Sequence, residues 1–179
     1  MAQRLRDGVE TDRLKIREFD ISDLEDLAAL VADNEQMTFY PRPKTRAEAA
    51  AWIERNRHLY DRYGFGSWLI AARSTSEFLG YCGIRPLALE GASEIEIGWH
   101  TKKTCWNRGI ATEAATAARD LAFGHFRLAR LVAIIHPAHD ASRRVAQKIG
   151  MRRERTTVVD EDYPAVVYAI RAAPVRARS

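Results

Sequence analysis

Residues 96 to 113 constrain the fold of this chain more than any other segment. An alternating, β-branched run ends in a basic loop, and that loop passes through Gly109 into an alanine-rich segment. Alternation predicts a strand, and alanine favours a helix. Glycine also lets the backbone approach a ligand closely. The segment therefore predicts a strand, a turn and a helix in direct succession.

The same turn has the chemistry of an anion site. The first N–H groups of a helix lack intrahelical partners, and the helix dipole favours negative charge beside them. Lys102, Lys103 and Arg108 add positive charge nearby. We expect a phosphate to bind the run Arg108, Gly109, Ile110, Ala111 and Thr112. The alternative is a plain connection in which glycine only eases the turn.

Composition is that of one globular domain. The chain has 179 residues, of which 46% are apolar and 29% charged. We expect a single domain over residues 1–179, with its core from about 10 to 172 and short polar termini. The net charge of +4 suits an anionic small molecule or an acidic partner. It is too small to argue for nucleic acid.

Cys82 and Cys105 are the only cysteines, and neither lies in a redox or metal-ligand spacing. This favours a reducing, cytoplasmic setting. His136 and His139 have no cysteine or acidic cluster to complete a metal site, and Pro137 disfavours a helix there. We therefore expect no metal. The chain shows no signal-peptide pattern and no apolar run of membrane-spanning length.

Periodicity predicts the remaining elements. We expect loose residues up to 10, then strands over 13–17, 67–73, 78–84, 93–100, 130–135, 152–158 and 165–171. Helices are expected over about 24–33, 46–63, 110–124 and 141–149. Capping boxes, in which an N-cap side chain and a glutamate three residues later bond each other's backbone, are predicted at Ser22–Glu25 and Thr45–Glu48. The order indicates a mixed α/β fold with one main sheet.

Three sequence blocks, in this order, resemble the GNAT superfamily of acetyl-CoA-dependent N-acetyltransferases. They are Glu96–Trp99, Trp106–Ala114 and Ser142–Met151, and the opening Thr11–Arg17 is also similar. Within the superfamily, the chain is most similar to the ribosomal-protein N-terminal acetyltransferases. The resemblance implies an α/β fold with a central mixed, mostly antiparallel sheet flanked by helices. It also implies that the fourth and fifth strands splay apart and that acetyl-CoA is the co-substrate.

Three positions depart from the superfamily pattern. Trp106 stands where arginine or glutamine usually precedes the first glycine, although tryptophan is usual in the resembled branch. His139 stands where the family often has asparagine. Ala146 occupies the position of the tyrosine that serves as the acid, when present. The usual group that protonates the leaving thiolate is therefore missing.

Acetyl transfer to an amine requires a neutral nucleophile and a stabilised oxyanion. Glu94 and Glu96 are two apart on one expected strand and so point to the same face. Glu96 is the better candidate base, directly or through a water, unless both are solvated carboxylates. The resemblance implies that the backbone of Trp99, His100 and Thr101 binds the pantetheine arm, with one N–H facing the thioester carbonyl.

The helix that starts near Ser142 supplies the remaining candidates. The Ser142 hydroxyl could donate a hydrogen bond to the departing sulfur, or it could simply bond the backbone at the helix start. His139 and Arg143 are candidate coenzyme A contacts. Arg143, with Arg144, could hold the adenine-ribose phosphate, and solvated side chains are the alternative.

These observations predict an acetyl-CoA-dependent N-acetyltransferase. It would move the acetyl group directly to a primary amine, either a peptide α-amine or a small-molecule amine, without an acetyl-enzyme. Its partners would be acetyl-CoA and the acceptor, with neither nucleic acid nor membrane, and a homodimer is one possible assembly. Two alternatives stay open: a GNAT-fold module that binds an acyl-CoA without efficient catalysis, and a basic nucleic-acid-binding domain.

Overall fold

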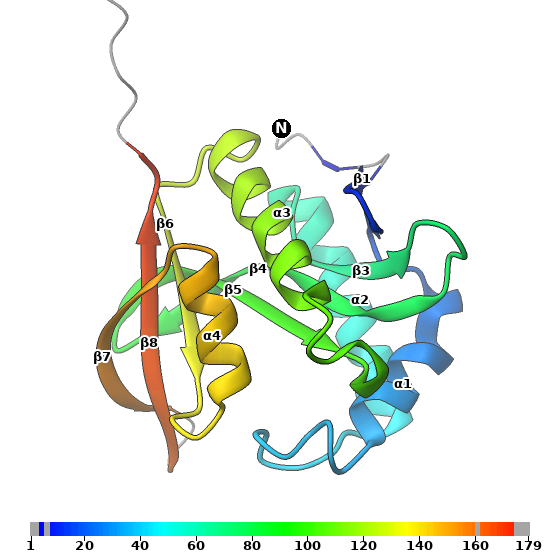
Figure 1. Ribbon diagram of the computed structural model, residues 1–179, viewed down its shortest axis with the longest axis horizontal. Helices are drawn as coiled ribbons and strands as arrows, with labels where there is room; N and C mark the ends of the chain where they lie inside the picture. Colours follow the sequence, from blue (N-terminus) through cyan, green and yellow to red (C-terminus); the bar gives the residue numbers. More distant parts are fainter. Residues whose placement is uncertain (1–3, 6–7, 160–161, 174–179) are drawn as a thin grey trace, which may run out of the picture.

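A computed structural model describes residues 4–5, 8–159 and 162–173 (Figure 1). What the sequence predicts for residues 1–3, 6–7, 160–161 and 174–179 lies outside the described residues. The strands are β1 (Val9–Glu10), β2 (Leu14–Arg17), β3 (Ser67–Ala72), β4 (Phe78–Leu89), β5 (Ala92–Thr101), β6 (Arg130–Ile135), β7 (Arg152–Val159) and β8 (Tyr163–Arg171). The α-helices are α1 (Leu24–Ala32), α2 (Arg46–Tyr63), α3 (Ile110–Gly124) and α4 (Asp140–Lys148). Two short 3₁₀ turns, Ile21–Asp23 and Lys103–Cys105, precede α1 and α3.

Within the described residues, eight strands form one sheet in the order β1-β2-β3-β4-β5-β6-β8-β7. Neighbouring strands are antiparallel except β5 and β6, which run parallel and share the single register pair Glu96↔Val132. Beyond that pair the two strands diverge and leave a V-shaped opening in the ribbon (Figure 1). β5 and β6 are the fourth and fifth of the strands expected from the sequence, because β1 was not expected. The predicted mixed, mostly antiparallel sheet with its splayed strand pair is confirmed.

Helices cover both faces of the sheet. α3 and α4 lie side by side on one face, and α1 and α2 pack together on the other (Figure 1). The sequence of β3 is continuously apolar because both of its faces are buried. Trp68 and Ile70 join the core beneath α3, whereas Leu69 and Ala71 join the core beneath α1 and α2. A strand buried on both faces has no polar side to alternate with.

The predicted capping box at Ser22–Glu25 is wrong. A 3₁₀ turn precedes α1, and its capping box is formed by Asp20, which accepts from Ser22 N at 3.1 Å, and Asp23, which accepts from Asp20 N at 2.8 Å. Asp23 is buried and also forms an ion pair with Arg17 at 2.7 Å. This pair with Arg17 fixes the carboxylate where it caps the turn, and α1 itself has no side-chain cap.

The second predicted box is confirmed. Thr45 Oγ1 accepts from Glu48 N at 3.2 Å, and the Glu48 carboxylate accepts from Thr45 N at 2.8 Å. Gly64, with φ of 80°, ends α2 in the left-handed conformation, directly after the expected helix end at residue 63.

Two strands extend further than the sequence indicates. Val9 and Glu10, expected to be loose, pair with Ile16 and Lys15 of β2. β4 continues past Ile84 to Leu89, because Pro86 does not end it. Pro86 lies opposite Ile95 of β5, while the register of β3 with β4 stops at Gly83. The missing N–H of Pro86 thus falls on an edge that no strand pairs with.

Candidate active site

The start of α3 leaves backbone donors open. Gly109 precedes the helix with φ of 77°, a left-handed conformation that favours glycine, and no side chain caps the helix. The first backbone bond runs from Glu113 N to Gly109 O, at 3.0 Å. Among the described residues, no acceptor bonds the preceding N–H groups, which belong to Ile110, Ala111 and Thr112. These donors lie at the positive end of the helix dipole.

Contacts on both sides hold this turn in place. Trp106 Nε1 donates to Thr101 O at the end of β5, at 3.1 Å. Arg13, just before β2, donates to Arg108 O at 2.9 Å and pairs with Glu113 at 2.6 Å. A Cβ added at Gly109 would come within 4 Å of one described atom, Arg13 Nη2 at 3.4 Å. The backbone at Gly109 is therefore open to close approach.

The register of β5 decides which backbone groups face the splayed gap. Lys102 N donates to Leu79 O of β4 at 2.8 Å, and the pairing continues through Tyr81↔His100. Because antiparallel pairs alternate, the backbone of His100 points toward β4, whereas those of Trp99 and Thr101 point toward β6. The Thr101 carbonyl already accepts a hydrogen bond from Trp106 Nε1. Trp99 thus presents its backbone to the gap, whereas the backbone of His100 does not face it.

A cavity of about 120 Å³ lies in the gap between β5 and β6. It brings together four of the sequence-predicted site residues, Glu96, Trp99, His139 and Ser142. Other walls come from the connection between α1 and α2, which supplies Phe39 and Tyr40, and from β8, which supplies Tyr163. The turn at residues 108–112 and Arg143 do not line it.

Glu96 is the carboxylate that reaches this cavity. Its side chain is 13% exposed and pairs with Arg85, its register partner on β4. Burial raises the pKa of Glu96, and the Arg85 charge opposes that rise. Glu94 does not line the cavity; it pairs with Arg130 at 3.1 Å. Of the two carboxylates, Glu96 has the position and the environment of a base.

An aromatic cluster surrounds His100 on the same face. The His100 side chain is buried, its ring stacks on Tyr40 with centroids 5.4 Å apart, and Nδ1 lies 3.5 Å from the Tyr81 hydroxyl. Its Nε2 has no hydrogen-bond partner among the described residues. Burial lowers the pKa of His100 to about 4 and raises that of Tyr81 to about 12. All three rings are therefore uncharged at neutral pH.

The sequence did not point to Tyr40 or Tyr81 as site residues. Tyr40 as a whole residue is 39% exposed, but its hydroxyl is buried against Tyr81, and this burial raises the Tyr40 pKa. Tyr40 comes from a connection far from β5 in the chain, so no local spacing links it to Glu96. The position of Tyr81 opposite His100 follows only from the register of β4 with β5.

The start of α4 places the other candidates differently. His139 precedes the helix without a side-chain cap bond, and its ring stacks on Phe39 with centroids 4.2 Å apart. Ser142 lines the cavity and has no hydrogen bond to the backbone of the described residues, so the helix does not use it as a cap. Ala146 is fully buried and supplies no acid.

Arg143 is engaged within the protein. Its guanidinium donates to the Tyr168 hydroxyl at 3.3 Å, to Pro137 O at 3.1 Å and to Asp140 at 3.0 Å. These bonds join the start of α4 to β8. Contact between Arg143 and a phosphate would have to compete with them, and the proposed cofactor role of this residue stays a prediction.

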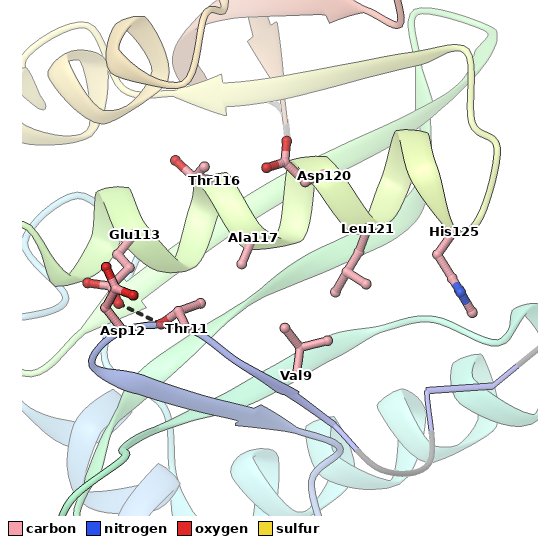
Figure 2. Close-up of a pocket in the computed structure, with 9 residues that line it drawn as sticks. All are labelled: Val9, Thr11, Asp12, Glu113, Thr116, Ala117, Asp120, Leu121 and His125. Carbon is pink, nitrogen blue, oxygen red and sulfur yellow. Dashed lines mark hydrogen bonds between the residues drawn. The ribbon is translucent and has the colours of Figure 1, made fainter.

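A larger hollow, of about 570 Å³, lies elsewhere, between the β1–β2 turn and α3 (Figure 2). Val9 and Leu121 point into it from opposite sides, and Thr11 bonds Glu113 at 2.5 Å across one end (Figure 2). None of the sequence-predicted site residues lines this hollow. Size alone therefore does not identify the candidate site.

No group of three or more His, Cys, Asp and Glu residues within the described ranges could hold a metal ion. Likewise, no helix in the described part of the chain is both long and apolar enough to cross a membrane. Cys82 and Cys105 are both buried and free of disulfides.

Comparison with known proteins decides the family. The sequence model of the acetyltransferase (GNAT) domain matches residues 13–152. The chain belongs to the GNAT acetyltransferase family. A relative, the uncharacterised protein YkkB of Bacillus subtilis, is 35% identical over 147 residues, which cover 82% of this chain and 86% of YkkB. The family resemblance drawn from the three sequence blocks is confirmed.

Solved GNAT structures share the fold. A GNAT-family acetyltransferase of Bacillus anthracis matches with a TM-score of 0.76 at 26% identity, over 91% of this chain and 97% of that one. RimL, a ribosomal L7/L12 α-N-protein acetyltransferase solved with coenzyme A, matches with a TM-score of 0.70 at 21% identity. That match covers 90% of this chain and 96% of RimL. At this identity, the likeness to RimL establishes the fold alone.

Proposed function

We propose that this chain is an acetyl-CoA-dependent N-acetyltransferase that moves the acetyl group directly to a primary amine. One observation carries the proposal. The same strand, β5, presents Glu96 to the cavity in the splayed gap and leads, through the turn at residues 102–109, to the open N–H groups of α3. A thioester held along this path would have its anionic part at the helix start and its reactive carbonyl near Glu96.

The residues present fit coenzyme A. The N–H groups of Ile110, Ala111 and Thr112 would hold the pyrophosphate, and Gly109 leaves room for close approach. The backbone of Trp99 would bond the pantetheine arm, as a neighbouring strand would. Arg108 is exposed beside the turn and would add positive charge. A GNAT relative solved with coenzyme A supports this assignment.

The chemistry divides among few groups. Glu96 takes a proton from the amine, directly or through water, and the amine nitrogen attacks the thioester carbonyl. A backbone N–H at Trp99 stabilises the oxyanion. The C–N bond forms as the carbonyl becomes the oxyanion, and the C–S bond breaks as the carbonyl is restored. Ser142 donates a hydrogen bond to the departing sulfur, which takes its proton from solvent because position 146 carries no acid.

This limited proton chemistry favours an acceptor that is already partly neutral. An α-amine has a pKa of about 7.7–8.0, whereas that of a lysine-like amine is about 10.4. We therefore propose a peptide α-amine or an activated small-molecule amine as the acceptor. The buried Ala146 also favours a second candidate, a GNAT module that binds an acyl-CoA without efficient turnover.

Calorimetry with acetyl-CoA tests the binding part of the proposal. Arg108→Ala should weaken binding only in part, because backbone donors dominate the site. Gly109→Val should weaken it far more, since a branched side chain would occupy the space of the pyrophosphate. Gly109→Asn is the control for backbone strain, because asparagine tolerates the left-handed φ better than valine does. Unchanged affinity in a folded Gly109→Val protein would contradict the placement.

A further inference from the structure

A second cavity lies beyond Tyr40, on the face of the sheet covered by α1 and α2. Its volume is about 240 Å³, and Tyr40 lines both this cavity and the one that contains Glu96. The buried hydroxyl of Tyr40 meets that of Tyr81, which also lines the second cavity. Tyr40 therefore lies at the boundary between the second cavity and the one that contains Glu96.

The interior of this second cavity is apolar. Leu27 and Val31 of α1 and Met37 of the following connection line it. Trp52 of α2 lies across from them, with its ring 4.9 Å from that of Tyr81, centroid to centroid. Such walls suit an aromatic or branched aliphatic group and offer little to a strongly polar one.

The rim of the cavity is cationic. Lys44 and Arg55 line it, and neither side chain has a hydrogen-bond or ion-pair partner among the described residues. Glu48, the carboxylate on the rim, is already bound: Arg42 pairs with it at 2.6 Å, and Thr45 bonds it at the helix start. The rim therefore has two cations available to a ligand and no carboxylate to balance them.

We propose that this cavity takes the body of the acceptor and selects a particular class of amine. The acceptor would carry its primary amine at one end, an aromatic or aliphatic body in the middle, and a carboxylate at the far end. The body would pack between Trp52 and the α1 side chains, and the carboxylate would meet Lys44 and Arg55. The amine would then point past Tyr40 toward Glu96. This inference rests on the proposed N-acetyltransferase function.

Three matched amines test the class. They are phenylalanine amide with a para-carboxylate on its ring, the same compound with a neutral para-carboxamide, and unsubstituted phenylalanine amide, each of which presents an α-amine. Coenzyme A release should give kcat/KM about five- to tenfold higher for the carboxylate than for the carboxamide, as expected for contact with two exposed cations. The difference should lie in KM and should shrink at high salt, because exposed charges are screened.

Two variants assign this preference to the rim. Arg55→Gln and Lys44→Gln should each lower the ratio of kcat/KM for the carboxylate to kcat/KM for the carboxamide, because each removes one rim cation. Arg57→Gln is the matched control, because Arg57 is an exposed cation on α2 that does not line the cavity. Equal rates for the carboxylate and the carboxamide in the unmodified chain would overturn the proposed class, as would an undiminished preference in both rim variants.

Calorimetry of the carboxylate amine without acetyl-CoA distinguishes a failure of this inference from a failure of the proposed N-acetyltransferase function. Rim-dependent binding of that amine supports the cavity assignment even in a chain that releases no coenzyme A. Absence of acetyl-CoA binding would instead overturn the proposed function. Binding of acetyl-CoA together with no binding of the carboxylate amine would overturn the acceptor class alone.

Discussion

At the scale of single residues, Glu96 is the group on which the proposed chemistry depends most. Glu96→Gln should lower kcat/KM by about tenfold near neutral pH, less than the roughly 10²–10⁴-fold that a general base usually contributes, because the proposed acceptor is already partly neutral. The loss should shrink as pH rises, because more of the amine is then neutral without help. A pH profile of kcat/KM for both proteins measures this. A loss of several orders of magnitude at every pH would instead mark Glu96 as essential.

Glu94→Gln is the matched control. Glu94 lies two residues away on the same strand with a similar side-chain exposure, 16% against 13%. It pairs with Arg130 and does not line the cavity. Its replacement should leave the pH profile of kcat/KM unchanged.

His100 should make the folded chain sensitive to acid. Burial lowers its pKa from 6.5 to about 4, so between these values the unfolded chain binds a proton that the folded chain does not. The free energy of unfolding should therefore be fully retained above pH 6.5 and fall as pH drops toward 4. At pH 5 the contribution lost amounts to about 2 kcal/mol.

Urea unfolding at pH 7 and pH 5 measures that loss. A folded His100→Gln protein has no imidazole to protonate, so its free energy of unfolding should fall less between the two pH values. An identical fall in both proteins would show that other groups cause the acid sensitivity.

At the scale of elements, the two predicted capping boxes make a direct comparison. Thr45→Ala should reduce the free energy of unfolding by about 1 kcal/mol, because it removes the acceptor for Glu48 N at the start of α2. Ser22→Ala should change it far less, since the turn before α1 is capped by Asp20 and Asp23. Chemical unfolding of both variants checks the difference. Equal losses would contradict the caps described here.

At the scale of the whole molecule, the position of the cysteines favours a ternary complex over an acetyl-enzyme. Cys82 is fully buried and burial raises its thiol pKa; Cys105 is 4% exposed. Neither lines the cavity at Glu96. Replacing both by alanine should preserve turnover in a folded protein, with intersecting rather than parallel double-reciprocal plots. A trapped acetyl-cysteine in mass spectra would refute direct transfer.

Patterns between neighbours in the sequence were enough to predict much of this protein. Gly109 and the alanines after it predicted the α3 start, and Thr45 with Glu48 predicted the α2 cap, because both depend on residues within one helical turn. Alternation located most strands, and ordered sequence blocks indicated the family. The second half of β4 was not predicted because proline usually ends a strand. Whether a strand tolerates Pro86 depends on which of its edges is unpaired, and the sequence does not show this.

Tertiary structure alone decided the rest, because it depends on contacts between residues more than one helical turn apart. The pairing of Asp23 with Arg17 moved the cap that Ser22 was expected to provide. The register of β4 with β5 put Arg85 beside Glu96 and Tyr81 beside His100. Folding of the α1–α2 connection over the sheet brought Tyr40 between the two cavities. Local sequence specifies an element and its ends, whereas side-chain contacts across the sheet arise only when the elements pack together.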